Sequence, residues 1–537
     1  MSGDRHNASI LGLKPGHDGA MASLIAGTLI HSFEAEKDSG ERNGSLGLET
    51  LLEVVQFMES DPAVIAVGGW HRDVAGRMTP LYAGYHGLRP GTLTTRKVFG
   101  RALTFYSSSH ERSHIFSAVA MAPYAAGQPM AILVWEGIIG ALYHWDGSGK
   151  SIRRFPVLSE PGARYAALFC IADPRFSDAR PWPDRTAAGK LMAVVGLADE
   201  KPASAESQSL VDSLLSAESM YPDFKIRHRA SPLYNTGIPS EELARAAKYM
   251  SDRIFSIFAE RAASIFPRGK LPLVISGGCG LNCDWNTGWR DSGIFSSVFV
   301  PPCANDSGSA IGTAVDAYVS LGGDCTIDWK IDSGAPFIHD LAPERRGWTR
   351  SAYRPESLAD VIATGEVVAW VKGNCEIGPR ALGHRSLIAR ATDIASRDTL
   401  NAIKKRAPYR PIAPACLAED LGAMFDRDFE DPYMLYFRRV REPFVLPAVA
   451  HTDDSARVQS VSESTNAEFY RLLREVKKTT GVGVVCNTSL NRPGRGFINR
   501  MSDLLDLAED RGVRHIVVDD DQYSRRPESP LSATTQR

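Results

Sequence analysis

Two histidines one helical turn apart, His110 and His114, are the residues most clearly spaced for chemistry. Ser108 and Glu111 fit a capping box, which predicts a helix that begins near Ser109. Residues four apart lie on one face of a helix, so both imidazoles can chelate the same divalent ion. A carboxylate would complete a two-histidine, one-carboxylate set suited to Fe(II) or Zn(II). The alternative is a helix start whose histidines bond to backbone or water.

Asp306 is the candidate for the third ligand. It lies in CANDSGSAIGTA, after an expected strand at Val298–Val300 and just before a helix expected from Ser307. The alternative role is a helix cap, because Asp is a preferred N-cap residue and the glycines nearby would let chains pack closely.

A glycine-rich turn follows a second expected strand. Gly277 and Gly278 come directly after Leu271–Ser276 and precede Asn282. Glycines at such a strand end let backbone amides approach a nucleotide, although most glycine-rich turns are only tight turns. Both this turn and the loop of Asp306 lie at carboxyl ends of strands, where open α/β sheets bind ligands.

The second half of the sequence carries a cluster of cations in EIGPRALGHRS and KKRAPYRPIAPA. The cluster consists of Arg380, Arg385, Lys405, Arg406 and Arg410. The second segment is too rich in proline for a helix, so a rigid loop positions its side chains. Rigid guanidinium groups match phosphate oxygens, and Arg457 and the turn Asn487–Ser489 can add contacts. The alternative is a solvated basic face.

The elements that must position these residues show a duplication. Apolar runs at Ser9–Leu13 and Met21–Ile25 flank a Gly-bearing turn, and runs at Ala131–Trp135 and Ala141–Trp145 flank another. Each pair is a hairpin signal. Two such hairpins predict a duplicated α/β subdomain.

The polar stretch 327–353 contains the expected domain boundary. We predict a first domain at 1–345, a second at 346–524, and a disordered polar tail at 525–537.

Composition limits the classes of function. Lys plus Arg number 61 and Asp plus Glu 63 among 537 residues, so the net charge of -2 offers no general attraction for nucleic acid. The sequence shows neither a signal-peptide pattern nor an apolar run of about 18 residues, so we expect a cytoplasmic protein without a membrane partner. The eight cysteines form no CxxC pair, which favours reduced thiols.

Seven unusual motifs occur along the chain, in the same order as in one known protein family. They are KPGHDG (14–19), SSSHERSH (107–114), ISGGCGLNCDWN (275–286), PPCANDSGSAIGTA (301–314), GPRALGHRS (378–386), YRPIAP (409–414) and NTSLN (487–491). Together they resemble the carbamoyltransferase family of antibiotic biosynthesis. The first two motifs look closest to cephem 3-hydroxymethyl carbamoyltransferases, whereas the related tobramycin and ansamycin members differ before the His-Asp pair.

The resemblance implies a fold and a route. The first domain would be similar to tRNA threonylcarbamoyl transferases, with a duplicated actin-like ATPase architecture, and the second to YrdC-type threonylcarbamoyl-adenylate synthases. The second domain would form carbamoyl adenylate from carbamoyl phosphate and ATP. The first would transfer the carbamoyl group to an acceptor hydroxyl, in a cephem by first choice and otherwise in a macrolide, an ansamycin or a sugar.

The resemblance also implies roles for residues. His110, His114 and Asp306 would bind Fe(II) or another divalent metal, and Mg(II) is a further candidate cofactor. Four residues would bind carbamoyl phosphate: Arg380, Arg410, Arg457 and Asn487. Five would border the nucleotide: Glu136, Gly137, Gly277, Gly278 and Asn282. His17 would face the acceptor, and Lys37 or Arg42 would add contacts.

This sequence departs from the family pattern in two places, which leaves its nucleotide and acceptor contacts open. Many members carry Asp-Gly where this chain has Glu136-Gly137, and the usual Glu-Glu-Arg run is blurred around residues 34–43. We expect His17 to take the proton from the acceptor hydroxyl, since histidine is the usual general base. A metal-bound group that polarises the acceptor is the alternative.

Two rival functions start from the same fold. A tRNA-modifying enzyme would need a basic track, which the charge balance does not provide. An actin-fold small-molecule kinase would leave the arginine motifs of the second half without a role. Neither the acceptor nor the oligomeric state follows from the sequence.

Overall fold

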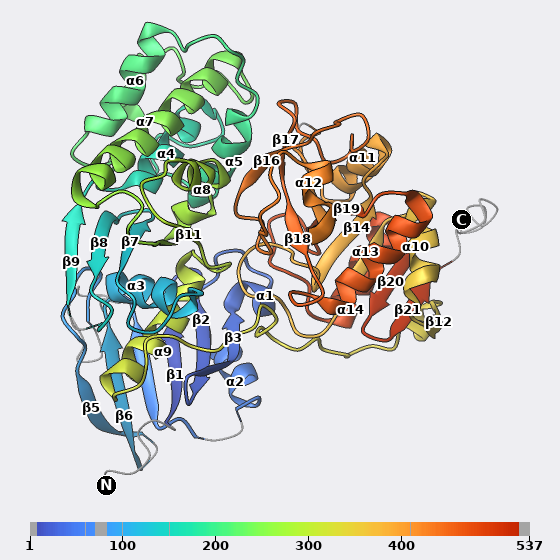
Figure 1. Cartoon of the computed structure of the whole chain (residues 1–537), viewed down its shortest axis with the longest axis horizontal. Helices are drawn as coiled ribbons and strands as arrows, with labels where there is room; N and C mark the ends of the chain where they lie inside the picture. Colours follow the sequence, from blue (N-terminus) through green and yellow to red (C-terminus); the bar gives the residue numbers. More distant parts are fainter. Residues whose placement is uncertain are drawn as a thin grey trace. The chain divides into compact units, whose positions relative to one another are not determined.

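The computed structural model describes residues 8–58, 61–69, 83–98, 100–149, 151–408 and 410–525, which separate into two compact units (Figure 1). The first unit contains residues 1–34 and 45–330, and the second contains 35–44 and 331–537. The boundary therefore falls between Lys330 and Ile331, whereas the sequence suggested 345 and 346. A ten-residue segment from the first half of the sequence, Ala35–Gly44, belongs to the second unit. Residues 526–537 of the predicted tail lie outside the described residues.

The first unit contains two sheets built on the same plan. The first has the strand order β3-β2-β1-β4-β6-β5, and the second, taken from the opposite end, has the order β9-β8-β7-β10-β11. The strands of the first sheet are β1 (Ser9–Lys14), β2 (Ala20–Ile25), β3 (Thr28–Glu34), β4 (Val64–Gly68), β5 (Leu93–Val98) and β6 (Arg101–Ser108). Those of the second are β7 (Met130–Trp135), β8 (Gly140–Trp145), β9 (Ile152–Pro156), β10 (Leu273–Ser276) and β11 (Val298–Phe299).

Strand directions match between the two sheets. β1, β2 and β3 form an antiparallel meander, and so do β7, β8 and β9. β4 and β6 then continue parallel to β1, just as β10 and β11 continue parallel to β7. Both predicted hairpins are present, and the duplication that they suggested is confirmed by strand order and direction.

Helices α3 (His110–Met121) and α9 (Ser309–Ser320) connect the two sheets. They pack on each other, α9 also packs on β1, β2 and β4, and α3 packs on β7 and β10 (Figure 1). The crossing is close: a Cβ atom at Gly312 would lie 1.8 Å from the carbonyl oxygen of Ser113. The remaining helices of this unit are α2 (Leu48–Val55), α4 (Pro161–Ala172), α5 (Arg185–Val195), α6 (Ala205–Ser216), α7 (Glu241–Ile265) and α8 (Cys283–Asp291).

The start of α3 differs from the predicted capping box. Ser109 is the N-cap, and its hydroxyl accepts from the backbone N–H of Arg112 at 3.1 Å. The hydroxyl of Ser108 instead donates to Asp316 at 2.7 Å, and the carboxylate of Glu111 accepts from Gly87 N–H. The helix begins where expected, but both predicted box residues serve tertiary contacts instead.

A buried ion pair holds α3 against α9. The Nε of Arg112 donates to Asp316 at 2.9 Å and its Nη2 makes a second bond to the same carboxylate. Both side chains are almost wholly buried. Two parallel bonds fix the geometry of the pair, and removal of either charge would leave the other buried without compensation.

We therefore predict that Arg112→Met destabilises the first unit by about 3–5 kcal/mol, the cost of an unpaired buried charge. Chemical unfolding monitored by circular dichroism would measure this loss. The double variant Arg112→Met/Asp316→Leu should recover part of it, because neither charge remains. An unchanged unfolding midpoint in the single variant would contradict the prediction.

The second unit is organised around an eight-stranded sheet of order β12-β21-β20-β13-β14-β19-β15-β18, with a separate pair, β16 and β17. The strands of the main sheet are β12 (Thr349–Ala352), β13 (Val368–Val371), β14 (Arg385–Arg390), β15 (Ala413–Leu417), β18 (Gln459–Val461), β19 (Val484–Ser489), β20 (His515–Val518) and β21 (Asp521–Ser524). The separate pair is β16 (Phe437–Arg439) and β17 (Ser455–Arg457).

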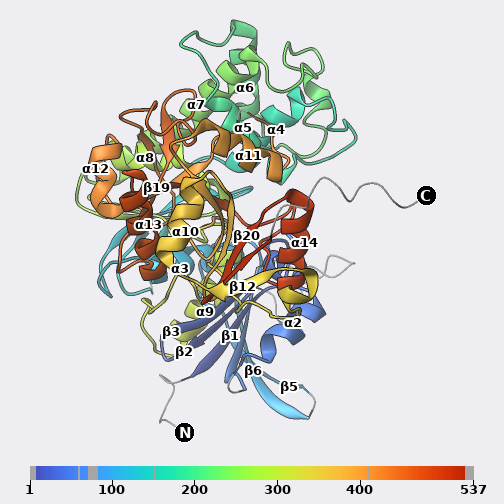
Figure 2. The same ribbon diagram turned by 90° about the vertical axis from the view of Figure 1, so that its right-hand side faces the viewer.

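Helices cover both faces of this sheet. α10 (Pro355–Ala363) and α13 (Ala467–Thr480) pack side by side against one apolar cluster, and Figure 2 shows them together. α11 (Ile394–Ile403), α12 (Leu421–Met424) and α14 (Met501–Arg511) contribute to the other cluster. Alternate residues of β13 enter alternate clusters, as a sheet buried on both faces requires. The short helix α1 (Ala35–Ser39) belongs to the segment from the first half.

The chain is mixed α/β throughout, as predicted. Across the part of the chain that the structure describes, no helix has the length and apolar character needed to cross a membrane.

Candidate active site

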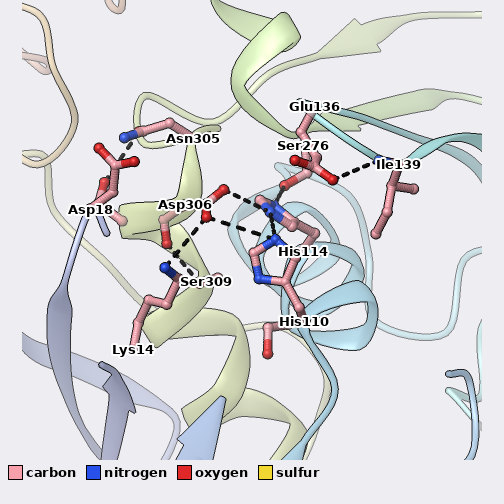
Figure 3. A network of polar contacts seen from close by, with 12 residues as sticks. Lys14, Asp18, His110, His114, Glu136, Ile139, Ser276, Asn305, Asp306 and Ser309 are labelled. Carbon is pink, nitrogen blue, oxygen red and sulfur yellow. Dashed lines mark hydrogen bonds and ion pairs between the residues drawn. The ribbon is translucent and has the colours of Figure 1, made fainter. Parts of the chain in front are cut away.

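The predicted metal ligands converge in the first unit (Figure 3). The Nε2 atoms of His110 and His114 lie 3.2 Å apart, and they lie 3.7 and 3.3 Å from the carboxylate oxygens of Asp306. All three side chains are buried. Asp306 begins a 3-10 turn, Asp306–Gly308, before α9, and its side chain caps no helix. The capping role considered for Asp306 is therefore wrong.

Two further groups from the first hairpin reach the same carboxylate. The ammonium group of Lys14 lies 3.4 Å from Asp306 Oδ2, and it also donates to the carbonyl oxygen of His17. The Nδ1 of His17 lies 3.5 Å from Asp306 Oδ2 and 3.0 Å from Asp18 Oδ2. Lys14 stands at the end of β1 and His17 in the turn to β2, so the hairpin positions both.

The protonation states favour metal binding. Burial lowers the pKa of His110 well below its ordinary value, although Asp306 opposes this shift. Burial alone would raise the pKa of Asp306, but His110, Lys14 and His114 hold it well below its ordinary value. A neutral imidazole and a carboxylate are the forms that coordinate a metal.

The donor set fits a divalent ion. His114 Nδ1 lies 2.9 Å from the hydroxyl of Ser276, a contact that leaves Nε2 to face the other ligands. Two Nε2 atoms and a carboxylate within 4.8 Å of one another match the two-histidine, one-carboxylate set. His17, Asp18 and Asp306 form a second group with the same spacing, so Asp306 is common to both.

Glycines border open space beside this centre. β7 and β10 are parallel neighbours, so Gly137 and Gly278 follow adjacent strand ends. A Cβ atom at either glycine would have no neighbour within 4 Å, whereas one at Gly277 would lie 2.3 Å from the carbonyl oxygen of Trp135. Gly277 therefore serves close strand packing, and the two others leave room for a ligand. Asn282 accepts two backbone N–H groups as the N-cap of α8.

Glu136 connects the glycine loop to the metal ligands. Its Oε1 accepts from the hydroxyl of Tyr85 and from Ile139 N–H, both at 2.6 Å. The ring of Tyr85 lies 4.5 Å from that of His110. Burial raises the pKa of Glu136, and the nearby Asp306 carboxylate raises it further. Glu136 therefore approaches the predicted metal ligands through the ring of Tyr85.

In the second unit, Asn487 organises the predicted carbamoyl phosphate residues. Its Nδ2 donates to Ala381 O at 3.2 Å and to Gln459 Oε1 at 2.9 Å. Arg380 immediately precedes Ala381, and Arg457 lies two residues before Gln459. Asn487 Oδ1 is buried and has no hydrogen-bond partner among the described residues.

Arg410 lies near the same strand. Ala413, three residues after Arg410, pairs with Asn487 across β15 and β19. The structure thus brings the chain segments of all four predicted residues to the middle of β19. Tyr409, the first residue of YRPIAP, lies outside the described residues.

A second group of cations gathers beside the end of β19. The ammonium of Lys404 donates to Ser489 O, to Asn491 O and to Asn491 Oδ1. Burial and then the charges of Arg406, Arg42 and Arg410 lower the pKa of Lys404 well below its ordinary value. Burial and then the charges of Arg410 and Arg42 lower the pKa of Arg406 to about 9. An arrangement of this kind can bind an anion.

Two of the residues singled out from the sequence, Arg385 and Lys37, are buried. Arg385 is fully buried, and its Nε and Nη2 donate to Asn499 Oδ1 at 2.9 and 2.8 Å, so it is part of the core. Lys37 lies in α1, is buried within the second unit, and donates to Glu376 O. The acceptor contact expected for Lys37 stays a prediction.

Sequence reasoning missed several members of these networks. They are Lys14, Tyr85, Ser276, Lys404 and Asn491. Lys14 carried one signal, since it is a charged residue that ends an otherwise apolar strand. Ser276 and Asn491 lie in two of the seven motifs, but no role was assigned to either. Tyr85 carried no signal, because its partner Glu136 is far away in the sequence.

Known families match most of the chain. Residues 88–315 match the family described as Carbamoyltransferase N-terminus, and residues 359–525 match Carbamoyltransferase C-terminus. The chain belongs to the carbamoyltransferase family. It is therefore a transferase enzyme, as the motifs indicated.

Relatives of this carbamoyltransferase align over nearly its whole length. The 3'-hydroxymethylcephem-O-carbamoyltransferase of Amycolatopsis lactamdurans is 49% identical over 96% of this chain and 99% of its own. The protein of the same name from Streptomyces clavuligerus is 48% identical over the same shares. Nodulation protein U of Rhizobium tropici is 32% identical over 91% of this chain and 92% of its own.

Solved structures resemble this carbamoyltransferase only weakly. The activator of 2-hydroxyisocaproyl-CoA dehydratase from Clostridium difficile with bound ADPNP is 14% identical, with a TM-score of 0.33, over 58% of this chain and 96% of its own. A score this low supports no conclusion about fold or ligand.

The shared position of Asp306 gives a prediction about metal content. Asp306→Asn should reduce bound iron or zinc from about one per chain to a small fraction of that, because the set loses its anionic ligand. Plasma emission spectroscopy after dialysis measures the content. Asp18→Asn is the matched control and should retain the metal. If Asp18→Asn lost the metal and His114→Gln kept it, the ion would be bound by the second group, which is His17, Asp18 and Asp306.

Proposed function

We propose that this carbamoyltransferase uses carbamoyl phosphate and ATP to carbamoylate the hydroxymethyl group of a cephem. The observation that carries the proposal is the identity of 49% over 96% of the chain to an enzyme named for that acceptor. The residues of both units supply the groups that such a reaction needs. A macrolide, ansamycin or sugar hydroxyl is the next acceptor class.

The second unit would carry out activation. Water adds to carbamoyl phosphate and releases inorganic phosphate and carbamate. An oxygen of the carbamate then attacks the α-phosphorus of ATP, the bond from that phosphorus to the pyrophosphate oxygen breaks, and carbamoyl adenylate and pyrophosphate result. Activation is needed because carbamate is anionic and resonance-stabilised, whereas the adenylate is neutral at the carbonyl and has a good leaving group.

The arrangement in the second unit supports this assignment. Arg380, Arg410 and Arg457 would bind the phosphate of carbamoyl phosphate bidentately. Asn487 would orient its carbamoyl group, since its buried Oδ1 is placed to accept an N–H bond. Lys404 and Arg406 would bind phosphates of ATP. We propose that this unit has the fold of the YrdC-type synthases.

The first unit would carry out transfer. The acceptor hydroxyl attacks the carbamoyl carbon, the bond to the phosphate oxygen breaks, and AMP leaves. A hydrogen bond from His17 Nδ1 to Asp18 would leave Nε2 as the basic nitrogen, so His17 is suited to take the hydroxyl proton. We propose an actin-like ATPase fold for this unit, given its two equivalent sheets.

His110, His114 and Asp306 would hold the divalent ion. When bound, the ion would supply Lewis-acid polarisation and neutralise phosphate charge. Gly137 and Gly278 would leave room for the adenylate, because no side chain occupies the space above either glycine. Glu136 and Tyr85 would fix the loop between nucleotide and metal.

Mass spectrometry of a panel of hydroxylated antibiotics incubated with the enzyme tests the proposal. We expect a carbamoyl mass gain on a hydroxymethylcephem that requires both ATP and carbamoyl phosphate, with release of AMP and pyrophosphate. A phosphoryl gain that needs only ATP would indicate a kinase and refute the proposal. A carbamoyl gain only on another scaffold would correct the acceptor alone.

His17→Ala separates the two half-reactions. Transfer should fall by about a hundred- to ten-thousand-fold, the contribution of a positioned general base. Carbamoyl phosphate-dependent release of pyrophosphate without acceptor should persist. His144→Ala, in β8 of the same unit, is the control. Near-normal transfer by His17→Ala would exclude the base role and favour a metal-bound group.

A further inference from the structure

The segment 35–44 packs closely on one loop of the second unit, residues 491–497. A Cβ atom at Gly496 would lie 1.8 Å from the carbonyl oxygen of Glu36. Gly496 N–H donates to Gly40 O at 3.2 Å, and Glu41 forms a β-bridge with Arg495. Lys37 lies 5.1 Å above the ring of Phe497. The segment is therefore a fixed part of this unit.

The same loop holds Lys404. Asn491 accepts from the Lys404 ammonium through its Oδ1, and its Nδ2 donates to Arg495 O at 2.7 Å. Asn491 also bridges to Phe497, which closes the loop. One side of the loop thus contacts Lys404, and the other contacts residues 36–41.

Arg42 follows directly after this contact. Its charge acts on both Lys404 and Arg406, together with that of Arg410. The charges that shift the pKa of Lys404 are those of Arg406, Arg42 and Arg410, and its hydrogen-bond acceptors are carbonyl and hydroxyl oxygens. Cations brought together in this way repel one another, and an anion with several charges would relieve that repulsion.

We propose that Arg42 binds the polyphosphate chain of ATP, alongside Lys404 and Arg406, during adenylate formation. The inference rests on the proposed function for the identity of the nucleotide. A triphosphate is the most highly charged reactant of the proposed reaction, and the charge of four neighbouring cations matches it better than a single phosphate group. Arg42 is exposed, so its guanidinium can reach a ligand without a change in the core.

This assignment gives Arg42 a different role from acceptor binding. A residue that binds ATP affects the activation half-reaction, whereas a residue that binds the acceptor affects the transfer. As ATP enters, Arg42 would neutralise charge on the β- and γ-phosphates. It would continue to do so as the bond from the α-phosphorus breaks and pyrophosphate takes the electron pair.

Calorimetric titration with inorganic tripolyphosphate tests the site without catalysis. Arg42→Gln should weaken binding about tenfold or more, the usual contribution of a charge-assisted bond. Arg42→Lys should bind tripolyphosphate with an affinity between those of Arg42→Gln and the wild type. The matched control is Arg350→Gln in the edge strand β12, an exposed arginine paired with Asp521, and it should bind as the wild type does. Equal affinity in Arg42→Gln and wild type, or no binding by wild type, would overturn the inference.

Steady-state kinetics distinguish ATP binding from acceptor binding. Arg42→Gln should raise the KM for ATP about tenfold and leave the KM for the acceptor unchanged. A change confined to the acceptor KM would overturn the inference. Weaker tripolyphosphate binding by Arg42→Gln, in an enzyme that forms no carbamoylated product, would refute the proposed function and leave the anion role of Arg42 standing.

Discussion

The carboxylate of Asp306 is buried among groups that come from both repeats of the first unit. Lys14 reaches it from the first hairpin, and His110 and His114 reach it from the helix that packs on the second sheet. A buried carboxylate is tolerated only where opposite charge and hydrogen bonds compensate for lost water. The duplicated architecture meets this condition, because its two parallel strand ends and two crossing helices deliver the partners to one point.

The candidate sites of the two units have opposite charge. In the first, carboxylates are surrounded by histidines and a lysine, an arrangement suited to a cation. In the second, Lys404 lies among the positive charges of Arg406, Arg42 and Arg410. The two arrangements therefore differ in the sign of the ligand that each could bind, a cation in the first unit and an anion in the second.

Local signals in the sequence predicted the hairpins, the helix at His110 and the segments that meet at β19, because apolar periodicity and turn residues determine them. Contacts between distant segments could not be predicted in the same way. Ser108 fitted a cap motif but donates to Asp316, which is 208 residues away. Arg385 belonged to a cationic motif but pairs with Asn499 in the core. The placement of residues 35–44 in the second unit depends on the close approach of Gly496, which composition does not reveal.

That ten-residue segment has a consequence for how the chain is made. It leaves the ribosome long before residues 331–525, yet it completes the unit that those residues form. The second unit is therefore discontinuous in the sequence, and its contacts with residues 35–44 close a loop of several hundred residues. These contacts cannot form before residues 491–497 have been made, which slows folding of this unit. A cut between Lys330 and Ile331 would leave residues 35–44 on the first fragment, so the second fragment would not contain its whole unit. The second fragment would lack Arg42 and the backbone that Gly496 accommodates.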